Sequence, residues 1–127
     1  MDVGMDEVRV VIPAQARFLR IARLTAAGVA GDLGFDLREI EDLRVAVDEM
    51  CAVVIEGAPD DVELSLVYRA GDGELEIEGR CPQDGVAPEI HPIARELLAM
   101  TADEHETGAS DGVRSFRLVK RRTDRSA

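Results

Sequence analysis

A glutamate in the most apolar part of a predicted helix is the first candidate for chemistry. The helix is predicted over residues 37–55, and within 45–55 only Asp48 and Glu49 are polar. At about 100° per residue, Glu49 lies roughly opposite the main apolar stripe of the helix, beside further apolar residues. A carboxylate in such a position is solvated, paired, or used for chemistry. The alternative to chemistry is a helix end that reaches the surface beside a groove.

Three arginines at three-residue spacing form a second candidate site. Arg17, Arg20 and Arg23 fall in a helix predicted over 14–30, on the side away from its apolar residues. The chain has a net charge of −11, so this stripe is a local inversion of the electrostatic field. Arginine is well suited to bind the carboxylates of a protein partner. The alternative is a solvated helix face whose arginines pair with acids nearby.

The remaining reactive residue types have no spacing that indicates a site. His91 and His105 are not arranged as metal ligands, and His105 has no second histidine four residues on. Cys51 and Cys81 form no metal or redox motif. We therefore expect no metal site of the chain's own, and a reduced, cytoplasmic protein.

The charge balance excludes two classes of partner. A net charge of −11 disfavours the phosphate backbone of a nucleic acid and an anionic membrane surface. No apolar run is long enough to span a membrane, and the acidic N-terminus does not resemble a signal peptide. The 127 residues are expected to form a single domain, 1–127, with frayed ends at 1–5 and 122–127.

The order of predicted elements indicates an α+β fold. Strands are expected over 7–12, 61–69, 74–78, 103–107 and 113–120, and helices over 14–30, 37–55 and 93–100. Residues 79–92 are expected to form an irregular loop because they contain three of the five prolines. Two strands with one polar face predict a sheet that helices cover on one side only. We expect a two-layer sandwich with a mostly antiparallel, mixed sheet.

Local signals define the two long helices. Asp36 is placed to cap the helix at 37–55, with Glu39 completing a capping box. The apolar stripe expected there is Leu37, Ile40, Leu43, Val47, Met50, Cys51 and Val54. The stripe expected in the helix at 14–30 is Phe18, Ile21, Ala22, Thr25 and Val29.

The central helix also resembles a known family. Ile40-Glu-Asp-Leu-Arg-Val-Ala-Val-Asp-Glu-Met-Cys51 is similar to the N-box helix of the anti-sigma-factor serine-protein kinases, the RsbW-like branch of the GHKL ATPases. The resemblance extends to residues 12–16 and 21–30, and it covers the first half of the chain better than the last strands. It implies the histidine-kinase-like ATPase fold, also called the Bergerat fold.

The resemblance assigns roles to a few residues. The family motif is E-x-x-x-N, in which the glutamate acts on the attacking hydroxyl and the asparagine binds Mg²⁺ beside ATP. Glu49 matches the base, whereas Val53 replaces the asparagine and offers no oxygen to Mg²⁺. The adenine-binding aspartate corresponds to Asp84, followed by Gly85, after a small shift, and to Cys81 without the shift. The alternative for Asp84 and Gly85 is an ordinary turn.

The segment between Gly85 and Ile93 is too short for the family's ATP lid and has no glycine pair to hold phosphates. Efficient phosphoryl transfer depends on positioning and charge neutralisation, so we expect a degenerate nucleotide site. The shortened lid adds to the missing Mg²⁺ ligand, and both leave ATP and Mg²⁺ without their usual contacts.

The expected function is that of an anti-sigma-factor-like regulator, which sequesters a sigma factor and is released by a STAS-domain anti-anti-sigma protein. In the family the first helix contacts both partners, and Arg23 in Ala22-Arg-Leu-Thr25 matches a partner-contacting arginine. A homodimer is also implied. The alternatives are an ATP-dependent serine-protein kinase of the same family that phosphorylates the STAS partner, and a silent scaffold domain.

Overall fold

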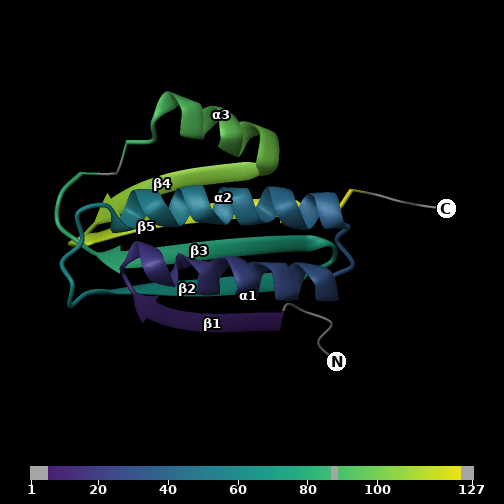
Figure 1. The fold of residues 1–127 in the computed structure, drawn as a ribbon, viewed down its shortest axis with the longest axis horizontal. Coiled ribbons are helices and arrows are strands. Elements are labelled where there is room, and N and C mark those ends of the chain that lie inside the picture. The colour runs from purple at the N-terminus through teal and green to yellow at the C-terminus, as the bar shows by residue number, and fades with distance from the viewer. Residues whose placement is uncertain (1–5, 87–88, 124–127) are drawn as a thin grey trace.

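The protein consists of one antiparallel sheet with helices on one of its faces (Figure 1). The computed structural model describes residues 6–86 and 89–123, which form five strands, three α-helices and one 3-10 helix. In chain order these are β1 (Asp6–Pro13), η1 (Ala16–Phe18), α1 (Leu19–Asp32), α2 (Leu37–Ile55), β2 (Glu63–Gly71), β3 (Glu74–Pro82), α3 (Pro92–Thr101), β4 (Glu104–Ser110) and β5 (Val113–Arg121).

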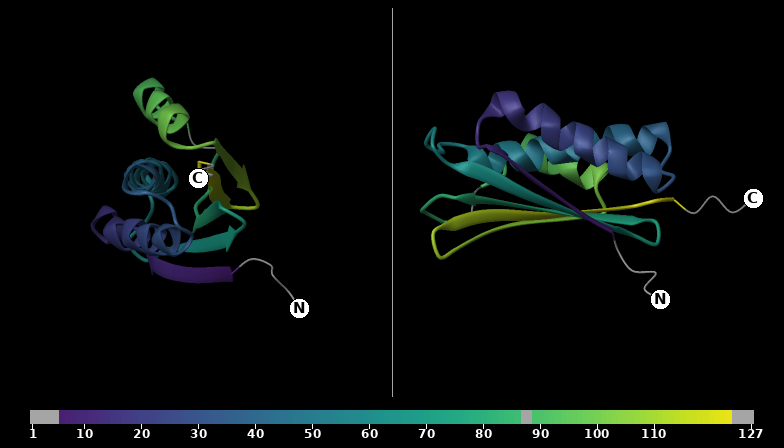
Figure 2. Two further views of the ribbon diagram at one scale, coloured as in Figure 1. Left: turned by 90° about the vertical axis from the view of Figure 1, so that its right-hand side faces the viewer. Right: turned by 90° about the horizontal axis from the view of Figure 1, so that it is seen from below.

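The sheet has the strand order β1-β2-β3-β5-β4, and all four strand pairs are antiparallel. Helices α1, α2 and α3 lie on the same side of it, and the opposite face carries no helix (Figure 2). The core lies between the two layers and is built mainly from aliphatic side chains, with Phe35, Tyr68 and Phe116 as its buried aromatic residues. The predicted two-layer α+β sandwich is confirmed.

Helix α2 begins and ends where the sequence predicts. Asp36 Oδ1 accepts a hydrogen bond from the Glu39 backbone at 2.8 Å, and Glu39 Oε1 accepts one from the Asp36 backbone at 2.8 Å. This capping box satisfies two donors that the first helical turn leaves free. The second oxygen of Glu39 accepts a hydrogen bond from the Thr123 backbone at 2.6 Å. Leu37 is 82% exposed, so its predicted place in the apolar stripe is wrong.

The buried face of α1 differs from the predicted stripe. Leu19, Ala22, Ala26 and Ala30 are buried, whereas Ile21 is 37% exposed. Small alanine side chains let α1 approach its neighbours closely, and this packing outweighs the larger apolar residues that the prediction favoured. The hydroxyl of Tyr68 on β2 also donates a hydrogen bond to the Ala22 carbonyl at 2.9 Å, which ties α1 to the sheet.

Strand β3 is longer than predicted and includes residues 79–82, which were expected to lie in a loop. Gly79 lies opposite Phe116 of β5, whose ring is 2% exposed. A Cβ atom on Gly79 would lie 2.2 Å from Phe116 Cε2, far inside van der Waals contact. Glycine is therefore required here because the ring occupies the space of its side chain, and its position does not mark the end of the strand.

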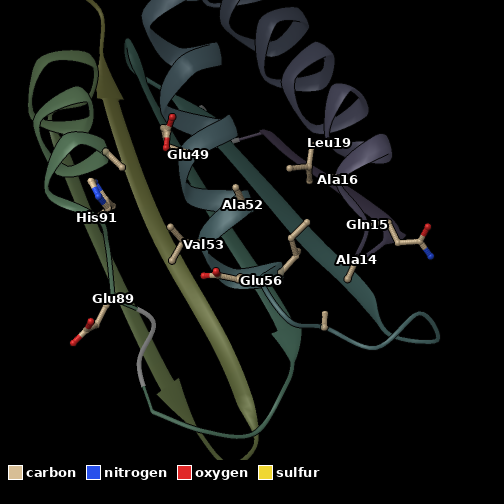
Figure 3. Close-up of a pocket in the computed structure, with 13 residues that line it drawn as sticks. Ala14, Gln15, Ala16, Leu19, Glu49, Ala52, Val53, Glu56, Glu89 and His91 are labelled. Atoms are coloured by element: carbon tan, nitrogen blue, oxygen red, sulfur yellow. The ribbon is translucent and has the colours of Figure 1, made fainter.

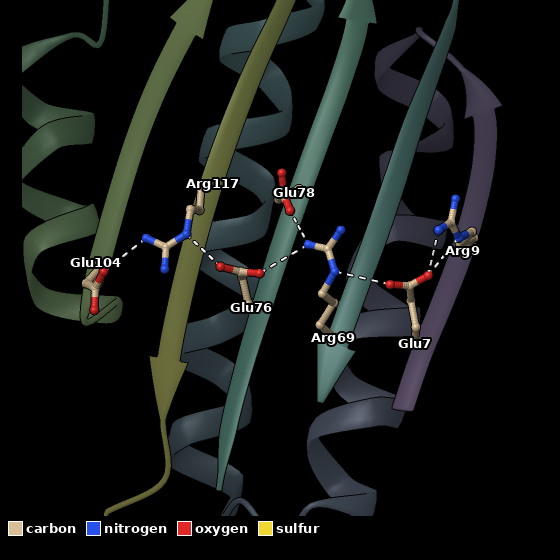
Figure 4. A network of polar contacts seen from close by, with 7 residues as sticks. All are labelled: Glu7, Arg9, Arg69, Glu76, Glu78, Glu104 and Arg117. Carbon is tan, nitrogen blue, oxygen red and sulfur yellow. Dashed lines mark hydrogen bonds and ion pairs between the residues drawn. The ribbon is translucent and has the colours of Figure 1, made fainter. Parts of the chain in front are cut away.

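A network of ion pairs crosses the helix-free face of the sheet (Figure 4). Glu76 accepts hydrogen bonds from Arg69 at 3.1 Å and from Arg117 at 2.6 Å. Arg69 also binds Glu7 on β1, and Arg117 binds Glu104 on β4. Hydrogen bonds from Arg117 and Arg121 hold the pKa of Glu104 below its ordinary value. Alternating charges thus connect all five strands on the face that the helices leave open.

The network predicts a measurable pH dependence of stability. The lowered pKa of Glu104 contributes stability that is present above about pH 4.5 and is lost as the pH falls further. In Arg117→Gln this contribution is reduced. We expect the free energy of unfolding, measured by urea titration, to fall less between about pH 5 and pH 3 in the variant than in the wild type. Arg44→Gln, which removes a pair outside the network, is the control and should follow the wild-type slope. Parallel slopes for all three proteins would contradict this prediction.

Candidate functional site

A groove of about 620 Å³ opens between the three helices at one end of the molecule (Figure 3). One wall is the start of η1 and α1, the floor is the C-terminal half of α2, and the other wall is the start of α3. The lining residues are Ala14, Gln15, Ala16, Leu19, Glu49, Ala52, Val53, Ile55, Glu56, Ala58, Glu89, His91 and Ala94. Most of them are apolar and five are alanines, so the groove is wide and its floor offers few polar atoms.

Helix α2 presents Glu49, Ala52, Val53 and Glu56 to the groove. These positions are three and four residues apart, so they share one face of the helix. The residues on the opposite face, which include Leu43, Val47 and Met50, are buried against the sheet. Glu49 therefore lies among apolar neighbours, as predicted, and beside a groove, which is the arrangement of the alternative to a chemical role.

Glu49 differs from its neighbour Asp48. Asp48 accepts a hydrogen bond from Arg23 of α1 at 2.7 Å, so its charge is compensated across the two helices. Glu49 is half-buried, and among the described residues none forms an ion pair or side-chain hydrogen bond with it. The groove therefore contains a carboxylate that is available to a ligand or a partner.

Two further carboxylates lie at the groove, Glu56 at the end of α2 and Glu89 in the loop before α3. Both are exposed, and within 6–86 and 89–123 neither forms a side-chain hydrogen bond or ion pair. His91 caps α3, and its Nδ1 accepts a hydrogen bond from the Ile93 backbone at 3.2 Å. No lysine or arginine is among the described lining residues, so the charged side chains that line the groove are all acidic.

Two features that would help to hold a magnesium nucleotide are not found among the described residues of the groove. Val53 lies at the position of the family's asparagine and presents only methyl groups. In the part of the chain that the structure describes, no three histidine, cysteine, aspartate or glutamate residues gather as a metal site. The polyphosphate of ATP is strongly anionic, and the three carboxylates would repel it without a cation between them.

Asp84 and Gly85 are separated from Glu49. They lie near the turn between β4 and β5, where the Oδ1 atom of Asp84 would be 3.2 Å from a Cβ atom on Gly112. Asp84 lines a different hollow, of about 500 Å³, that does not include Glu49. Cys81, the position reached without the shift, is fully buried in β3. The structure therefore does not bring the two candidate nucleotide residues together in one pocket.

Arg114 on β5 lies beside Cys81 and beneath the end of α2. Its Nη1 atom donates to the Glu56 carbonyl at 3.2 Å, while its Nε atom is buried without a partner among the described residues. The guanidinium lines a second hollow that adjoins the groove and shares Glu56, Glu89 and His91 with it. A guanidinium thus lies beside Cys81, one of the two positions that the resemblance offers for an adenine-binding aspartate.

The three arginines of the first helix have different surroundings. Arg23 pairs with Asp48, and Arg17 stacks on the Phe18 ring at 4.5 Å. Arg20 is exposed, and no residue in the described ranges pairs with it. Leu24, one turn further along α1, is 61% exposed. The free part of the arginine stripe is therefore centred on Arg20 and Leu24, while Arg23 is part of the α1–α2 contact.

Sequence reasoning missed Glu56, Glu89 and Arg114. Glu56 could have been found, because it lies seven residues after Glu49 and so falls on the same helix face. Glu89 and Arg114 reach the same end of the molecule from a loop and a distant strand. Only the tertiary fold brings these two residues together with α2.

Comparisons with known proteins agree with the motif in α2. The chain is 33% identical over 94 residues to the serine-protein kinase RsbW of Bacillus thuringiensis (strain Al Hakam), a match that covers 72% of the chain and 58% of that relative. It is 38% identical over 74 residues to RsbW of Bacillus cereus (strain AH820), covering 57% and 46%. These matches support an RsbW-like family for the chain. This RsbW-like chain spans little more than half the length of the curated relatives it matches.

A solved structure has the same fold as this chain. A crystal structure of the RsbU and RsbW domains of a Mycobacterium tuberculosis protein matches 92% of the RsbW-like chain and 32% of its own, with a TM-score of 0.69 and 16% identity. At this identity the likeness shows the fold alone. No family model matches the sequence. Over the described residues of the RsbW-like chain, none of the helices is both long and apolar enough to cross a membrane.

The charge and composition of the groove predict that nucleotide does not bind in the manner of the family. We expect isothermal titration calorimetry with Mg–ATP and Mg–ADP, up to about 1 mM, to show no saturable heat, because the groove repels phosphates and lacks the Mg²⁺ ligand. Glu49→Ala should behave like the wild type, and Glu41→Ala, about two turns earlier on α2 and not among the groove-lining residues, is the matched control. Clear binding that is lost in Glu49→Ala alone would contradict this prediction.

Proposed function

We propose that the chain is an anti-sigma-factor-like regulator that sequesters a sigma factor by protein–protein contact. A STAS-domain antagonist would compete for the chain and release the sigma factor. The nucleotide site is degenerate in this proposal, so binding and release depend on contact surfaces and not on phosphoryl transfer.

The observation that carries the proposal is the set of residues that α2 presents to the groove. Glu49 is retained, but Val53 stands four residues on and three unpaired carboxylates line the groove. Phosphoryl transfer requires metal ions or basic side chains to neutralise the developing negative charge. The described lining residues supply neither, so the geometry favours a binding role for this member of the family.

The exposed surface of α1 is the proposed contact for the sigma factor. Arg20 and Leu24 place a free cation and an exposed apolar side chain one turn apart on the outer face of this helix. Arginine beside an apolar residue is typical of protein interfaces, where the guanidinium pairs with a carboxylate and the apolar residue is desolvated. Arg17 extends this surface towards the start of the helix.

A second candidate function is supported by the position of Glu49. Because this carboxylate faces the groove, it is placed where a kinase of this family would keep its base. A serine-protein kinase that acts on a STAS partner would then need Mg²⁺ held by groups other than Val53. Phosphorylation of such a partner would establish this alternative.

The sequestration proposal predicts a defined loss of binding on α1. We expect Arg20→Glu to weaken binding to the cognate sigma factor at least tenfold, because it replaces a pairing cation with a repelling anion. Purified sigma factors from the source cell would be titrated by fluorescence anisotropy, with release by each STAS protein as the second readout.

The control is Arg38→Glu, which makes the same charge change at an exposed residue of α2. It should retain wild-type affinity. The proposal is overturned if no sigma factor binds the wild type, and the α1 contact is overturned if both variants lose the same affinity.

A further inference from the structure

The acidic residues of α2 divide into paired ones and a single unpaired one. Glu39 is held by the capping box, Glu41 pairs with Arg44, Asp42 with Lys120, and Asp48 with Arg23. Glu49 is the exception among the described residues, and it is the one that faces the groove. Each of the other acids of this helix thus has a hydrogen-bond or ion-pair partner, whereas Glu49 has none among the described residues.

Two more carboxylates without side-chain partners among the described residues lie at the edge of the groove. Glu56 and Glu89 join Glu49 from the end of α2 and from the loop before α3, and Figure 3 shows them spread along the groove rather than gathered at one point. Carboxylates that are spread in this way do not form a cage for one metal ion, which needs several oxygens within bonding distance. They are suited to several cations that are separated along an extended ligand.

The floor between these carboxylates is apolar. Ala52 and Val53 of α2 lie between Glu49 and Glu56, with Ala16 and Leu19 on the α1 side and Ala94 on the α3 side. Small side chains on three helices leave a volume of about 620 Å³, which is enough to accept several side chains. A ligand that complements the groove therefore needs both apolar side chains and positive charges.

We propose that this groove binds a basic amphipathic helix of a protein partner. Leucine-like side chains would enter between Leu19, Ala52 and Val53, and lysine or arginine side chains of the partner would pair with Glu49, Glu56 and Glu89. This is the helix-in-groove mode of recognition, with charge complementarity selecting the partner. This groove is separate from the Arg20 surface on α1, which attracts the opposite charge. Binding of a basic helix in the groove and sigma-factor contact through Arg20 can therefore be tested independently.

The test uses a defined probe. A labelled helical peptide of about four turns, built from lysine and leucine with the leucines on one face, would be titrated with the full chain by fluorescence anisotropy. We expect saturable binding in the micromolar range, and none for the counterpart in which glutamate replaces lysine. Binding of both peptides, or of neither, would overturn the proposal.

Matched variants separate the groove from the general acidity of the chain. The triple change Glu49→Gln, Glu56→Gln and Glu89→Gln should weaken binding at least tenfold. The control triple, Asp32→Asn, Glu63→Gln and Glu106→Gln, removes the same charge from exposed residues elsewhere and should weaken it less than threefold. Equal losses in the two triples would show binding to the overall charge and would overturn the proposal.

Two further arms test the apolar component. Ala52→Phe fills the floor of the groove without changing charge and should weaken binding at least tenfold, whereas Ala99→Phe, exposed on α3, should not. Spermine, which is cationic but lacks an apolar face with side chains, should compete poorly. The proposal of an amphipathic partner would be overturned if spermine displaced the peptide at the peptide's own concentration. It would also be overturned if Ala52→Phe bound the peptide as tightly as the wild type does. Circular dichroism would confirm that each variant is folded.

Discussion

Burial of one face of α2 against the sheet determines the direction of the residues that α2 contributes to the candidate site. Leu43, Val47 and Met50 are fully buried, and this leaves the opposite face of the helix to form the floor of the groove. Packing in the core therefore fixes the orientation of α2 about its own axis, and this orientation decides which of its residues face the groove. Because the capping box holds the start of this helix, the register between core and groove is fixed from the first turn.

Charge is distributed unevenly over this strongly acidic chain. On the helix-free face of the sheet, arginines alternate with glutamates in a network that reaches from β1 to β4. Around the groove the carboxylates have no such partners among the described residues. The contrast indicates that the unpaired negative charge at the groove is a feature of that site and does not follow from the overall composition alone. It opposes a polyphosphate and favours a cationic partner.

Helical periodicity and capping predicted α2 and its groove-facing glutamate well, because both depend on local sequence. The face of α1 was predicted less well. Its alanines are buried because α1 packs closely in the helical layer, and size alone suggested Ile21 instead. The extension of β3 through Gly79 depends on the Phe116 ring of a distant strand. Glu89 and Arg114 join the site only through tertiary structure, so no pattern in the sequence could place them there.

We propose that this RsbW-like chain acts by protein–protein contact alone and that its groove does not use nucleotide. The most direct measurement is the affinity for the cognate sigma factor with Mg–ATP, with Mg–ADP, and with EDTA and no nucleotide, each followed by size-exclusion chromatography. The account predicts a complex of the same affinity and elution volume in all three conditions. A complex that forms only with Mg–ATP, or dissociates when nucleotide is removed, would contradict it.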